Sequence, residues 1–477
     1  MDQDSNPYDP NRTAAAGPPE PVSASSSATG LRHQVIALSV LMSFSLYLDR
    51  ICLGEIVKSD GFLRDLQLEK QEIGRVLGAF FFTYALFQVP AGWVSDRYGA
   101  RRMMTGYILA WSLLTGLTGL MTGMAGLLLV RLGVGVAQAG AYPTSGAMIR
   151  RWIPPIQRGR ASSLVSFGGR LGGTLAPLLT AQLILFLGGW RETLWAYGFT
   201  GAGVALGYWW IVRDRPAEHP RCNEAERALI GRPVDDARPS ASEILPMLWS
   251  CCCSRSLWLN SLTQFCVNIG WVFLVTWLPT YLKESPGMPP IVAAVTTRFP
   301  TLFSNPGDAA TAIGATMVTA VLAMGMVGQL AGGWATDFCV RTFGLRRGRV
   351  IPLSLACWIA GAAYVCCLAL DNLWAIVACC GVVSLMTDVG TPSTWAFMQD
   401  VGGRNTAAIQ GWGNMWGNLG AALNSIMVPL ILESTAAAGA GQKLVFLSCA
   451  GAFLIAGLSA LGMDATKPVR RLAAADG

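Results

Sequence analysis

The chain has 477 residues, of which 52% are hydrophobic and only 13% are charged, and its formal net charge is +7. Soluble domains carry about a quarter charged residues, so this composition excludes an ordinary soluble protein and indicates a chain that crosses a membrane repeatedly. No group of its 13 cysteines and 2 histidines has the spacing of a metal site. We expect no cofactor and no metal, and interpret the cysteines as small hydrophobic residues, with lipidation of the cluster at 251–253 as the alternative.

The first 30 residues are rich in Pro, Ser, Ala and Gly. Such a segment has too few apolar side chains to bury a core, so it is predicted to be a disordered cytoplasmic tail. It lacks the basic and then apolar pattern of a cleaved signal, so the first apolar stretch is expected to remain as a helix.

Twelve apolar stretches follow, each close to the roughly 20 residues that a helix needs to cross a bilayer. They lie at residues 33–54, 71–93, 103–122, 125–149, 159–187, 193–213, 256–282, 309–335, 350–370, 373–398, 405–432 and 442–463. The basic residues concentrate in alternate connections, which predicts that both termini are cytoplasmic. The expected fold class is an all-α membrane protein with twelve transmembrane helices.

The longest cytoplasmic connection separates six of these stretches from the other six. We therefore expect two six-helix bundles with tails and a linker between them. The predicted divisions are a tail at 1–30, an N-terminal bundle at 31–213, a linker at 214–253, a C-terminal bundle at 254–463 and a tail at 464–477.

The two halves share an internal repeat. GWVSDRYGARR begins at Gly92, after the second stretch, and GWATDFCVRTFGLRR begins at Gly333, after the eighth. Equivalent motifs in two halves are typical of transporter folds, in which Gly allows close helix packing and Asp can cap or pair across the interface in one of two states. The conformational gate predicted from this repeat comprises Gly92, Asp96, Arg97, Arg101, Gly333 and Asp337.

The first of these motifs resembles the loop between the second and third helices of the major facilitator superfamily, G-x-x-x-D-R-x-G-R-R. From about residue 33 to 430 the chain also resembles the anion:cation symporter family within it, which includes bacterial galactonate, hexuronate and glucarate transporters. The resemblance implies two pseudo-symmetric bundles that transport by alternating access. The stretches that carry it are YLDR at 47–50, FFTYALFQVPAGWVSDRYGARR at 81–102, RLGVGVAQAGAYP at 131–143, RWIPPIQRGRA at 151–161, GWRETLWAYGFTG at 189–201, RDRPAEHPRCNEAE at 213–226 and TWLPTYL at 276–282.

Five ionisable side chains fall well inside the predicted spans: Asp49, Arg50, Arg131, Arg170 and Asp388. The three arginines and two aspartates have a net charge of +1. A buried charge requires a partner of opposite sign. A guanidinium matches a carboxylate in two-point contact, so the surplus predicts an organic anion as ligand.

The family resemblance implies specific roles for the stretch around residue 50. Arg50 corresponds to the arginine that contacts the substrate carboxylate, and Asp49 to the acid that pairs with Arg131 and takes part in proton coupling. Tyr47 and Tyr84 correspond to tyrosines that line the substrate cavity. The alternatives are a permanent salt bridge for the Asp49 pair and, for Arg50, a side chain that reaches the membrane interface.

One departure from the family pattern concerns coupling. Many relatives have Glu seven residues after the fourth-helix arginine, where this chain has Gln138. Gln cannot release a proton, so proton coupling is expected to run through Asp49 alone or through Asp388 as a replacement acid, with facilitated or sodium-linked transport as the alternative. Arg170 is predicted to bind a second anionic group of the substrate; the alternative is that Arg170 pairs with Asp388 and ties the halves together.

Neutral polar groups of the C-terminal half are expected to bind substrate hydroxyls, with helix packing as the alternative for each. These are Gln264, Asn268, Trp271, Trp395, Asn414 and Asn418.

The predicted protein is a multi-pass transporter of the cell inner membrane. It moves a small organic anion, such as a hexonate or hexuronate, together with H⁺ or another cation such as Na⁺. Its expected partners are that anion, the cation and the lipid bilayer, with no nucleic acid, and we expect a monomer. A nutrient sensor that binds the anion without transport is the alternative, whereas an enzyme is disfavoured because no catalytic set of residues occurs.

Overall fold

The computed structural model describes residues 27–231, 238–299, 305–434 and 441–469, and within these ranges the regular elements are helices without strands. Most of the predicted tail at 1–30, and residues 470–477 of the second tail, lie outside the described residues.

The N-terminal half forms eight helices. They are α1 (Leu31–Ile56), α2 (Asp60–Leu66), α3 (Lys70–Tyr98), α4 (Ala100–Thr118), α5 (Met124–Ala139), α6 (Ala141–Trp152), α7 (Arg158–Leu187) and α8 (Trp190–Ile211). The fourth predicted span corresponds to α5 and α6 together, and α2 is a short helix whose N-terminus is capped by the Ser59 side chain. These helices account for the first six predicted spans.

The connection between the halves contains two short helices, α9 (Glu224–Ile230) and α10 (Ile244–Cys253). The Glu226 carboxylate of α9 accepts hydrogen bonds from the backbone N–H groups of Gly30 and Arg32, at 3.0 and 3.2 Å. These are unpaired donors at the start of α1, so α9 caps the first transmembrane helix.

The C-terminal half is also built from helices throughout its described residues. They are α11 (Arg255–Val272), a π-helical turn (Phe273–Trp277), α12 (Leu278–Glu284), α13 (Met288–Arg298), α14 (Pro306–Cys367), α15 (Leu373–Val401), α16 (Thr406–Ser434) and α17 (Gly441–Leu461). Two spans lie within α14, because the backbone turns at Gly344, whose φ of 78° suits glycine. The sequence did not predict α13.

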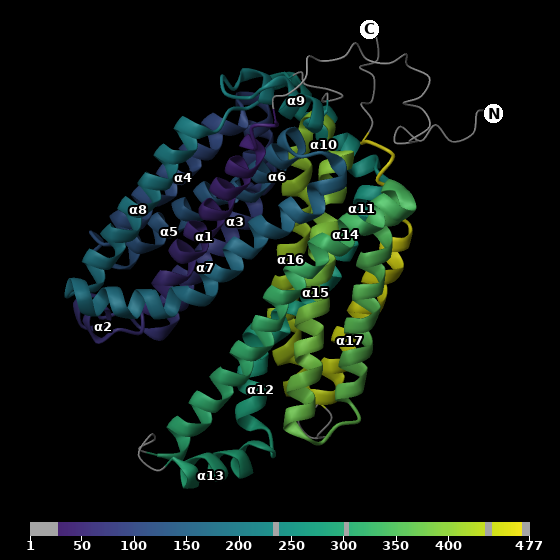
Figure 1. Ribbon diagram of the computed structural model, residues 1–477. Coiled ribbons are helices and arrows are strands. Elements are labelled where there is room, and N and C mark those ends of the chain that lie inside the picture. Colours follow the sequence, from purple (N-terminus) through teal and green to yellow (C-terminus); the bar gives the residue numbers. More distant parts are fainter. Residues whose placement is uncertain (1–26, 232–237, 300–304, 435–440, 470–477) are drawn as a thin grey trace.

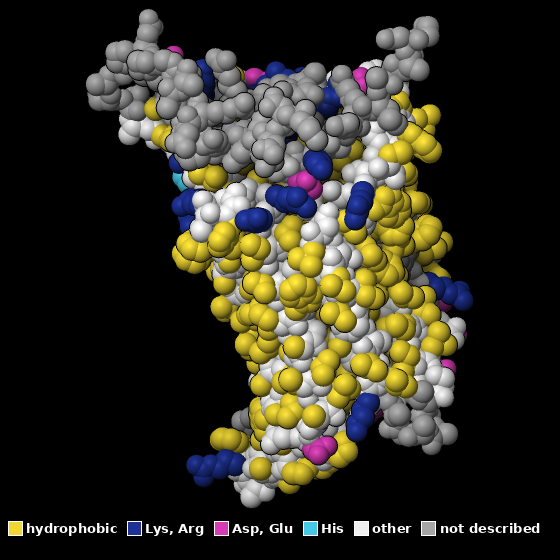
Figure 2. All heavy atoms as spheres, turned by 90° about the vertical axis from the view of Figure 1, so that its right-hand side faces the viewer, with side chains coloured by type: hydrophobic (Ala, Val, Ile, Leu, Met, Phe, Trp, Pro, Cys, Tyr) yellow, Lys and Arg dark blue, Asp and Glu magenta, His cyan; other side chains and the backbone are white. Residues whose placement is uncertain are grey.

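The helices form two bundles that converge at the end where α9 and α10 lie, here called the linker end, and diverge toward the opposite end, where α2, α12 and α13 lie (Figure 1). Among the described residues, nine helices are long and apolar enough to cross a membrane. Since α14 holds two spans, α4 and α8 complete the predicted twelve. Figure 2 shows a broad hydrophobic surface along the C-terminal bundle, with basic side chains gathered toward the linker end.

Close packing of α7 on α1 sets the position of the intramembrane charges. A Cβ atom at Gly168 would lie 2.5 Å from the Val40 carbonyl oxygen, and one at Gly172 would lie 2.4 Å from that of Phe44. Only glycine permits this approach of two backbones. Arg170, between these glycines, is thereby held next to the helix that carries Arg50.

Candidate functional site

Arg50 lies among three aromatic rings. Its guanidinium carbon is 4.4 Å from the ring centroid of Tyr84, 4.9 Å from that of Tyr47 and 5.1 Å from that of Phe80. Tyr47 is three residues before Arg50 on α1, and Phe80 and Tyr84 are four apart on α3, so helical spacing places each pair on one face. The negative faces of the rings stabilise a cation without neutralising it.

Gln138 of α5 is the hydrogen-bond partner of Arg50. The Arg50 Nε donates to Gln138 Oε1 at 3.2 Å, and the Gln138 Nε2 donates to the Leu46 carbonyl oxygen at 3.3 Å. The Arg50 Nη2 is buried and has no hydrogen-bond partner among the described residues. Arg50 therefore keeps both its full positive charge and an unused donor.

Asp49 and Arg131 do not form the expected ion pair in this structure. Both side chains are buried, and neither Oδ atom of Asp49 nor the Nε of Arg131 has a hydrogen-bond partner within the described part of the chain. Arg131 instead lies over the ring of Phe80, at 5.4 Å. Asp49 and Arg131 are therefore not in direct ion-pair contact in this state, although the Arg131 guanidinium and the Trp111 side chain both lie close enough to act on the buried carboxyl group.

Arg170 and Asp388 form a contact between the two bundles. The Arg170 Nη2 on α7 donates to Asp388 Oδ1 on α15 at 2.6 Å, and its guanidinium lies 4.4 Å from the ring of Trp271 on α11. Asp388 is buried, whereas about a quarter (24%) of the Arg170 side chain is exposed. The pairing that the sequence left as an alternative is thus the arrangement present here.

Tyr142, at the start of α6, links the two sides of this region and was missed as a site residue. Its hydroxyl is 2.8 Å from the Ser43 hydroxyl, and its ring packs edge-on against Trp395 of α15, with centroids 4.9 Å apart. The Tyr47 ring also packs edge-on against the Tyr142 ring, with centroids 6.4 Å apart. The only sequence signal was its place in the family stretch RLGVGVAQAGAYP.

The amides predicted on α11 face α16 rather than the arginines. A Cβ atom at Gly413 would lie 2.2 Å from the Gln264 Nε2, and one at Gly417 would lie 2.9 Å from the Asn268 Nδ2. This geometry favours the helix-packing alternative for Gln264 and Asn268. Asn414 of α16 is also buried, and its carbonyl oxygen accepts a hydrogen bond from the Asn418 side chain at 2.8 Å.

The repeated motifs form two equivalent contacts at the linker end. Asp96, at the end of α3, accepts hydrogen bonds from the backbone N–H groups of Ala407 and Ala408, in the first turn of α16, at 3.1 and 2.9 Å. Such donors are unpaired at a helix start, and the helix dipole favours a carboxylate there. Each bond joins the N-terminal bundle to the C-terminal bundle.

In the second motif the aspartate belongs to the C-terminal bundle and the helix start belongs to the N-terminal bundle. Asp337 of α14 accepts from the backbone N–H groups of Gly159 and Arg160, at the start of α7, at 2.9 and 3.1 Å. The motif glycines permit the approach, since a Cβ atom at Gly92 would lie 2.4 Å from the Ala407 carbonyl oxygen and one at Gly333 2.4 Å from the Ser163 hydroxyl.

Arg97 and Arg101 contact their own half of the chain and its linker. Arg97 donates to the Pro239 carbonyl oxygen at 3.4 Å, and Arg101 Nε donates to that of Trp209 at 2.9 Å. In this structure they therefore anchor the end of α8 and the linker, and the gate contacts between bundles are made by the two aspartates.

A further contact between the bundles at the linker end was not predicted. The Asp400 carboxylate of α15 accepts from Arg158 Nη1 of α7 at 2.5 Å and from Arg349 Nε of α14 at 2.8 Å. Arg349 is completely buried and also donates to the Pro155 carbonyl oxygen at 2.8 Å. Its only sequence signal was membership of a basic loop, which indicates topology but not pairing.

A family model described as Major Facilitator Superfamily matches residues 39–423 of this chain. The chain belongs to the major facilitator superfamily. It is therefore a multi-pass membrane transporter and not an enzyme, and its two bundles and repeated motifs are those that the superfamily resemblance implied.

Similar superfamily members include carriers named for small organic acids. The chain is 30% identical over 329 residues to a protein of Cupriavidus necator named as a probable sulfoacetate transporter, covering 68% of this chain and 70% of that protein. It is 28% identical over 436 residues to a D-galactonate transporter of Escherichia coli, covering 87% and 92%. It is 25% identical over 423 residues to a probable galactarate/D-glucarate transporter of Bacillus subtilis, covering 85% and 87%.

Solved superfamily structures share the fold. The crystal structure of the E. coli fucose:proton symporter matches with a TM-score of 0.63 at 16% identity, covering 89% of this chain and 98% of that one. A likeness at this identity supports the twelve-helix architecture alone.

Proposed function

We propose that this transporter moves a small organic anion, such as a hexonate, a hexuronate or another sugar acid, by alternating access together with H⁺ or another cation. The observation that carries the proposal is Arg50. Within the described chain no carboxylate forms an ion pair with it, its hydrogen-bond partner is a neutral amide, and its Nη2 has no acceptor. An anionic ligand would supply both the missing charge and the missing acceptor.

The aromatic groups around Arg50 suit the rest of such a ligand. Tyr47, Tyr142 and Trp395 form a continuous set of ring contacts from α1 through α6 to α15. Tyrosine hydroxyls can bond sugar hydroxyls, and ring faces can pack on C–H groups. We propose Tyr47, Arg50, Tyr84 and Tyr142 as the substrate-binding set, with Trp395 and Asn414 on the opposite bundle.

Arg170 would bind a second anionic group. The Asp388 carboxylate already neutralises Arg170, with its Oδ1 2.6 Å from the Arg170 Nη2. The second acidic group of a substrate would therefore have to replace Asp388 at the guanidinium. We propose that substrates with two acidic groups make this exchange and that monoanions leave the pair intact. Asp388 would then be released or protonated whenever a dianion binds.

Asp49 is the proposed proton-coupling residue. It is a buried carboxyl group directly before Arg50 on α1, so a proton bound or released there would change the charge beside the proposed substrate site. Movement of Arg131 toward Asp49 would favour its ionised form and release the proton. Alternating access would connect these states by breaking the Asp96 and Asp337 contacts at the linker end.

Orientation and location follow from the same proposal. We place the linker end, with both termini, in the cytoplasm of a cell with the protein in its inner membrane, because basic residues concentrate at that end. We propose 31–213, 214–253 and 254–463 as the limits of the N-terminal bundle, the linker and the C-terminal bundle.

Uptake into proteoliposomes tests the proposal. Purified protein is reconstituted, and entry of labelled galactonate, glucarate or sulfoacetate is measured with and without a pH gradient, beside Arg50→Ala. Saturable uptake that the variant loses is the expected result. Binding in solution without uptake would instead favour a sensor, and uptake that survives Arg50→Ala would remove Arg50 from the site.

A further inference from the structure

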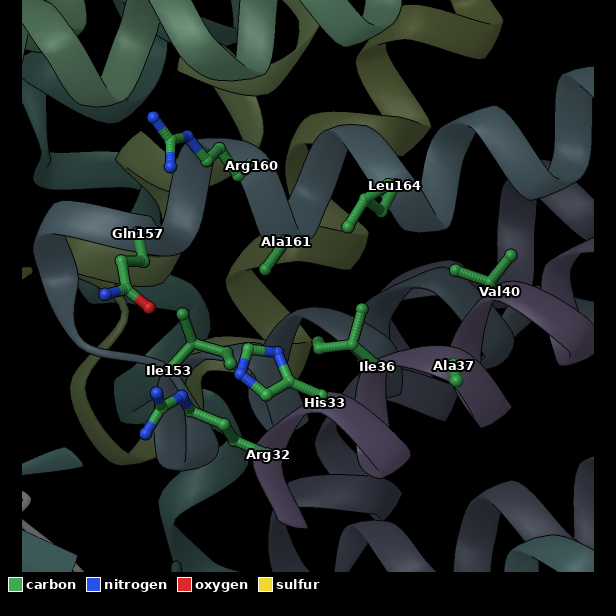
Figure 3. A pocket seen from close by; sticks show the side chains of 10 residues that line it. All are labelled: Arg32, His33, Ile36, Ala37, Val40, Ile153, Gln157, Arg160, Ala161 and Leu164. Carbon is green, nitrogen blue, oxygen red and sulfur yellow. The ribbon is translucent and has the colours of Figure 1, made fainter. Parts of the chain in front are cut away.

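A groove lies between the linker ends of α1 and α7, away from the central arginines (Figure 3). Its volume is about 630 Å³, within the roughly 300–1,000 Å³ typical of small-ligand sites. The residues that line it are Arg32, His33, Ile36, Ala37, Val40, Ile153, Gln157, Arg160, Ala161 and Leu164. We propose that this groove binds an anionic phospholipid of the leaflet at the linker end, with its phosphate at the basic end and an acyl chain along the apolar end.

The lining separates into a polar end and an apolar end, as an amphiphile requires. Figure 3 shows Arg32, His33, Gln157 and Arg160 at one end of the groove, with Ile153 among them, and Ala37, Val40 and Leu164 at the other end. Arg32 and His33 lie in the first turn of α1, Arg160 lies in the first turn of α7, and Gln157 directly precedes α7, so we expect this polar group at headgroup depth. The apolar group lies one to two turns farther along the same helices, which is toward the hydrocarbon of the bilayer.

The two arginines at the basic end form only long ion pairs within the protein. The Arg160 Nε lies 3.7 Å from Asp337 Oδ2, and 44% of its side chain is exposed. No hydrogen bond from this guanidinium to the described residues is present, because Asp337 is held by the backbone N–H groups of residues 159 and 160. Arg32 Nη1 lies 3.4 Å from Glu226 Oε2. Both pairs are longer than the roughly 2.7–2.9 Å of a charge-assisted bond. The exposed Arg160 guanidinium can therefore bond a phosphate, whereas the Arg32 Nε and Nη1 are buried and Arg32 would attract the phosphate mainly through its charge.

The apolar end indicates a lipid and not a free anion. Leu164 of the groove is 42% exposed, and Leu41, one turn after Ala37 on α1, is 45% exposed. In a protein that spans a membrane, such surfaces face acyl chains. A soluble phosphate would gain nothing from Ala37, Val40 or Leu164, whereas a phospholipid gains the burial of part of a chain. The site is independent of the transported substrate.

Lipid binding to the purified full-length protein tests this site. Native mass spectrometry measures retention of phosphatidylglycerol against phosphatidylcholine for wild type, Arg32→Gln, Arg160→Gln and Ala37→Trp, and inorganic phosphate is added as a competitor. The control is Arg255→Gln, since Arg255 is exposed at the linker end of α11, which occupies the same place in the other half as α1. Far-UV circular dichroism and thermal unfolding check that each variant folds.

We expect phosphatidylglycerol to be retained preferentially. Each basic residue near a membrane surface contributes about fivefold in affinity, so each arginine variant should lose about that factor while Arg255→Gln stays like wild type. Ala37→Trp should reduce lipid retention by filling the apolar end. Equal retention of the two lipids, unchanged retention in both arginine variants, or loss in Arg255→Gln alone would overturn the proposal. Displacement by millimolar phosphate that Ala37→Trp does not alter would identify a free-anion site instead.

Discussion

The Nε of Arg50 donates a hydrogen bond to the Oε1 of Gln138 at 3.2 Å, which joins an intramembrane cation to a neutral side chain. A glutamate at this position would place a carboxylate against the guanidinium and would have to be displaced or protonated before a substrate anion could bind. With glutamine, Arg50 is available at any pH at which arginine is charged. If Arg50 binds the substrate anion as proposed, we expect the residue at position 138 to influence how that binding depends on pH.

Gln138→Glu should make substrate binding pH-dependent. At neutral pH the new carboxylate competes with the substrate for Arg50, and we expect a loss of about tenfold, which corresponds to about 1.4 kcal/mol. Affinity should recover as the pH falls, because protonation removes the competing charge. Equilibrium binding between pH 5 and 8 measures this. Gln138→Met, which removes the hydrogen bond without adding charge, is the control and should show no comparable recovery.

Arg50→Lys should retain charge but lose most of the affinity. A planar guanidinium can bond a carboxylate at two points, whereas an ammonium group cannot. Hydrogen bonds to charged groups contribute about 1.5–3 kcal/mol, so binding should weaken by about 10- to 100-fold, and Arg50→Ala should lose it altogether. Isothermal titration calorimetry measures both. Arg75→Ala, at an exposed position of α3, is the control; wild-type affinity in Arg50→Lys would argue against two-point contact.

Arg170 and Asp388 should behave as a coupled pair in unfolding. Arg170→Gln leaves the buried Asp388 carboxylate without its partner, at a cost of about 3–5 kcal/mol, while the double variant Arg170→Gln/Asp388→Asn removes both charges. We expect the double variant to be more stable than Arg170→Gln alone. A double-mutant cycle of thermal unfolding in detergent measures the coupling, and additive effects would show that the 2.6 Å contact contributes little.

Gly92→Leu should open the linker end. The new side chain would begin 2.4 Å from the Ala407 carbonyl oxygen, so α3 and α16 must separate and the hydrogen bonds from Ala407 and Ala408 to Asp96 must break. Hydrogen–deuterium exchange should then increase in residues 406–412. Gly106→Leu is the matched control, because a Cβ atom at Gly106 of α4 would meet no atom within 4 Å. Unchanged exchange in Gly92→Leu would mean that this contact does not hold the bundles together.

His219 should contribute a loss of stability in acid. Its Nε2 donates to the Ile211 carbonyl oxygen and its Nδ1 accepts from the Arg221 N–H, so both ring nitrogens are used by the neutral form. Burial lowers the pKa of His219 below its ordinary value. Below a pH of about 6.5 the unfolded state therefore binds more protons at this residue than the folded state does. The contribution of neutral His219 to folding stability is fully present above that pH and is lost as the pH falls below it. Thermal unfolding from pH 8 to 5 should show a smaller decrease in His219→Gln; equal slopes would contradict this.

The sequence by itself determined the membrane class, the approximate positions of the spans and the repeated motifs. Each depends on local properties of the chain. A run of about 20 apolar residues suffices for a spanning helix, and a glycine and an aspartate four residues apart lie on the same face of a helix. The repeat also located both aspartates that cap helices of the opposite bundle. The arginines of the membrane interior were recognised for the same reason, since a charge among apolar residues is visible in the chain itself.

Only the tertiary structure decided which of these groups meet. Asp400 bonds to Arg158, 242 residues away, and Arg170 bonds to Asp388 across 218 residues, so no spacing rule relates them. Asp49 and Arg131 are both buried without a direct contact between them, because the distance between two side chains on α1 and α5 depends on how these helices pack. Local sequence specifies which face of a helix a side chain occupies, whereas contact between helices depends on the packing of glycines and aromatic rings from the whole chain.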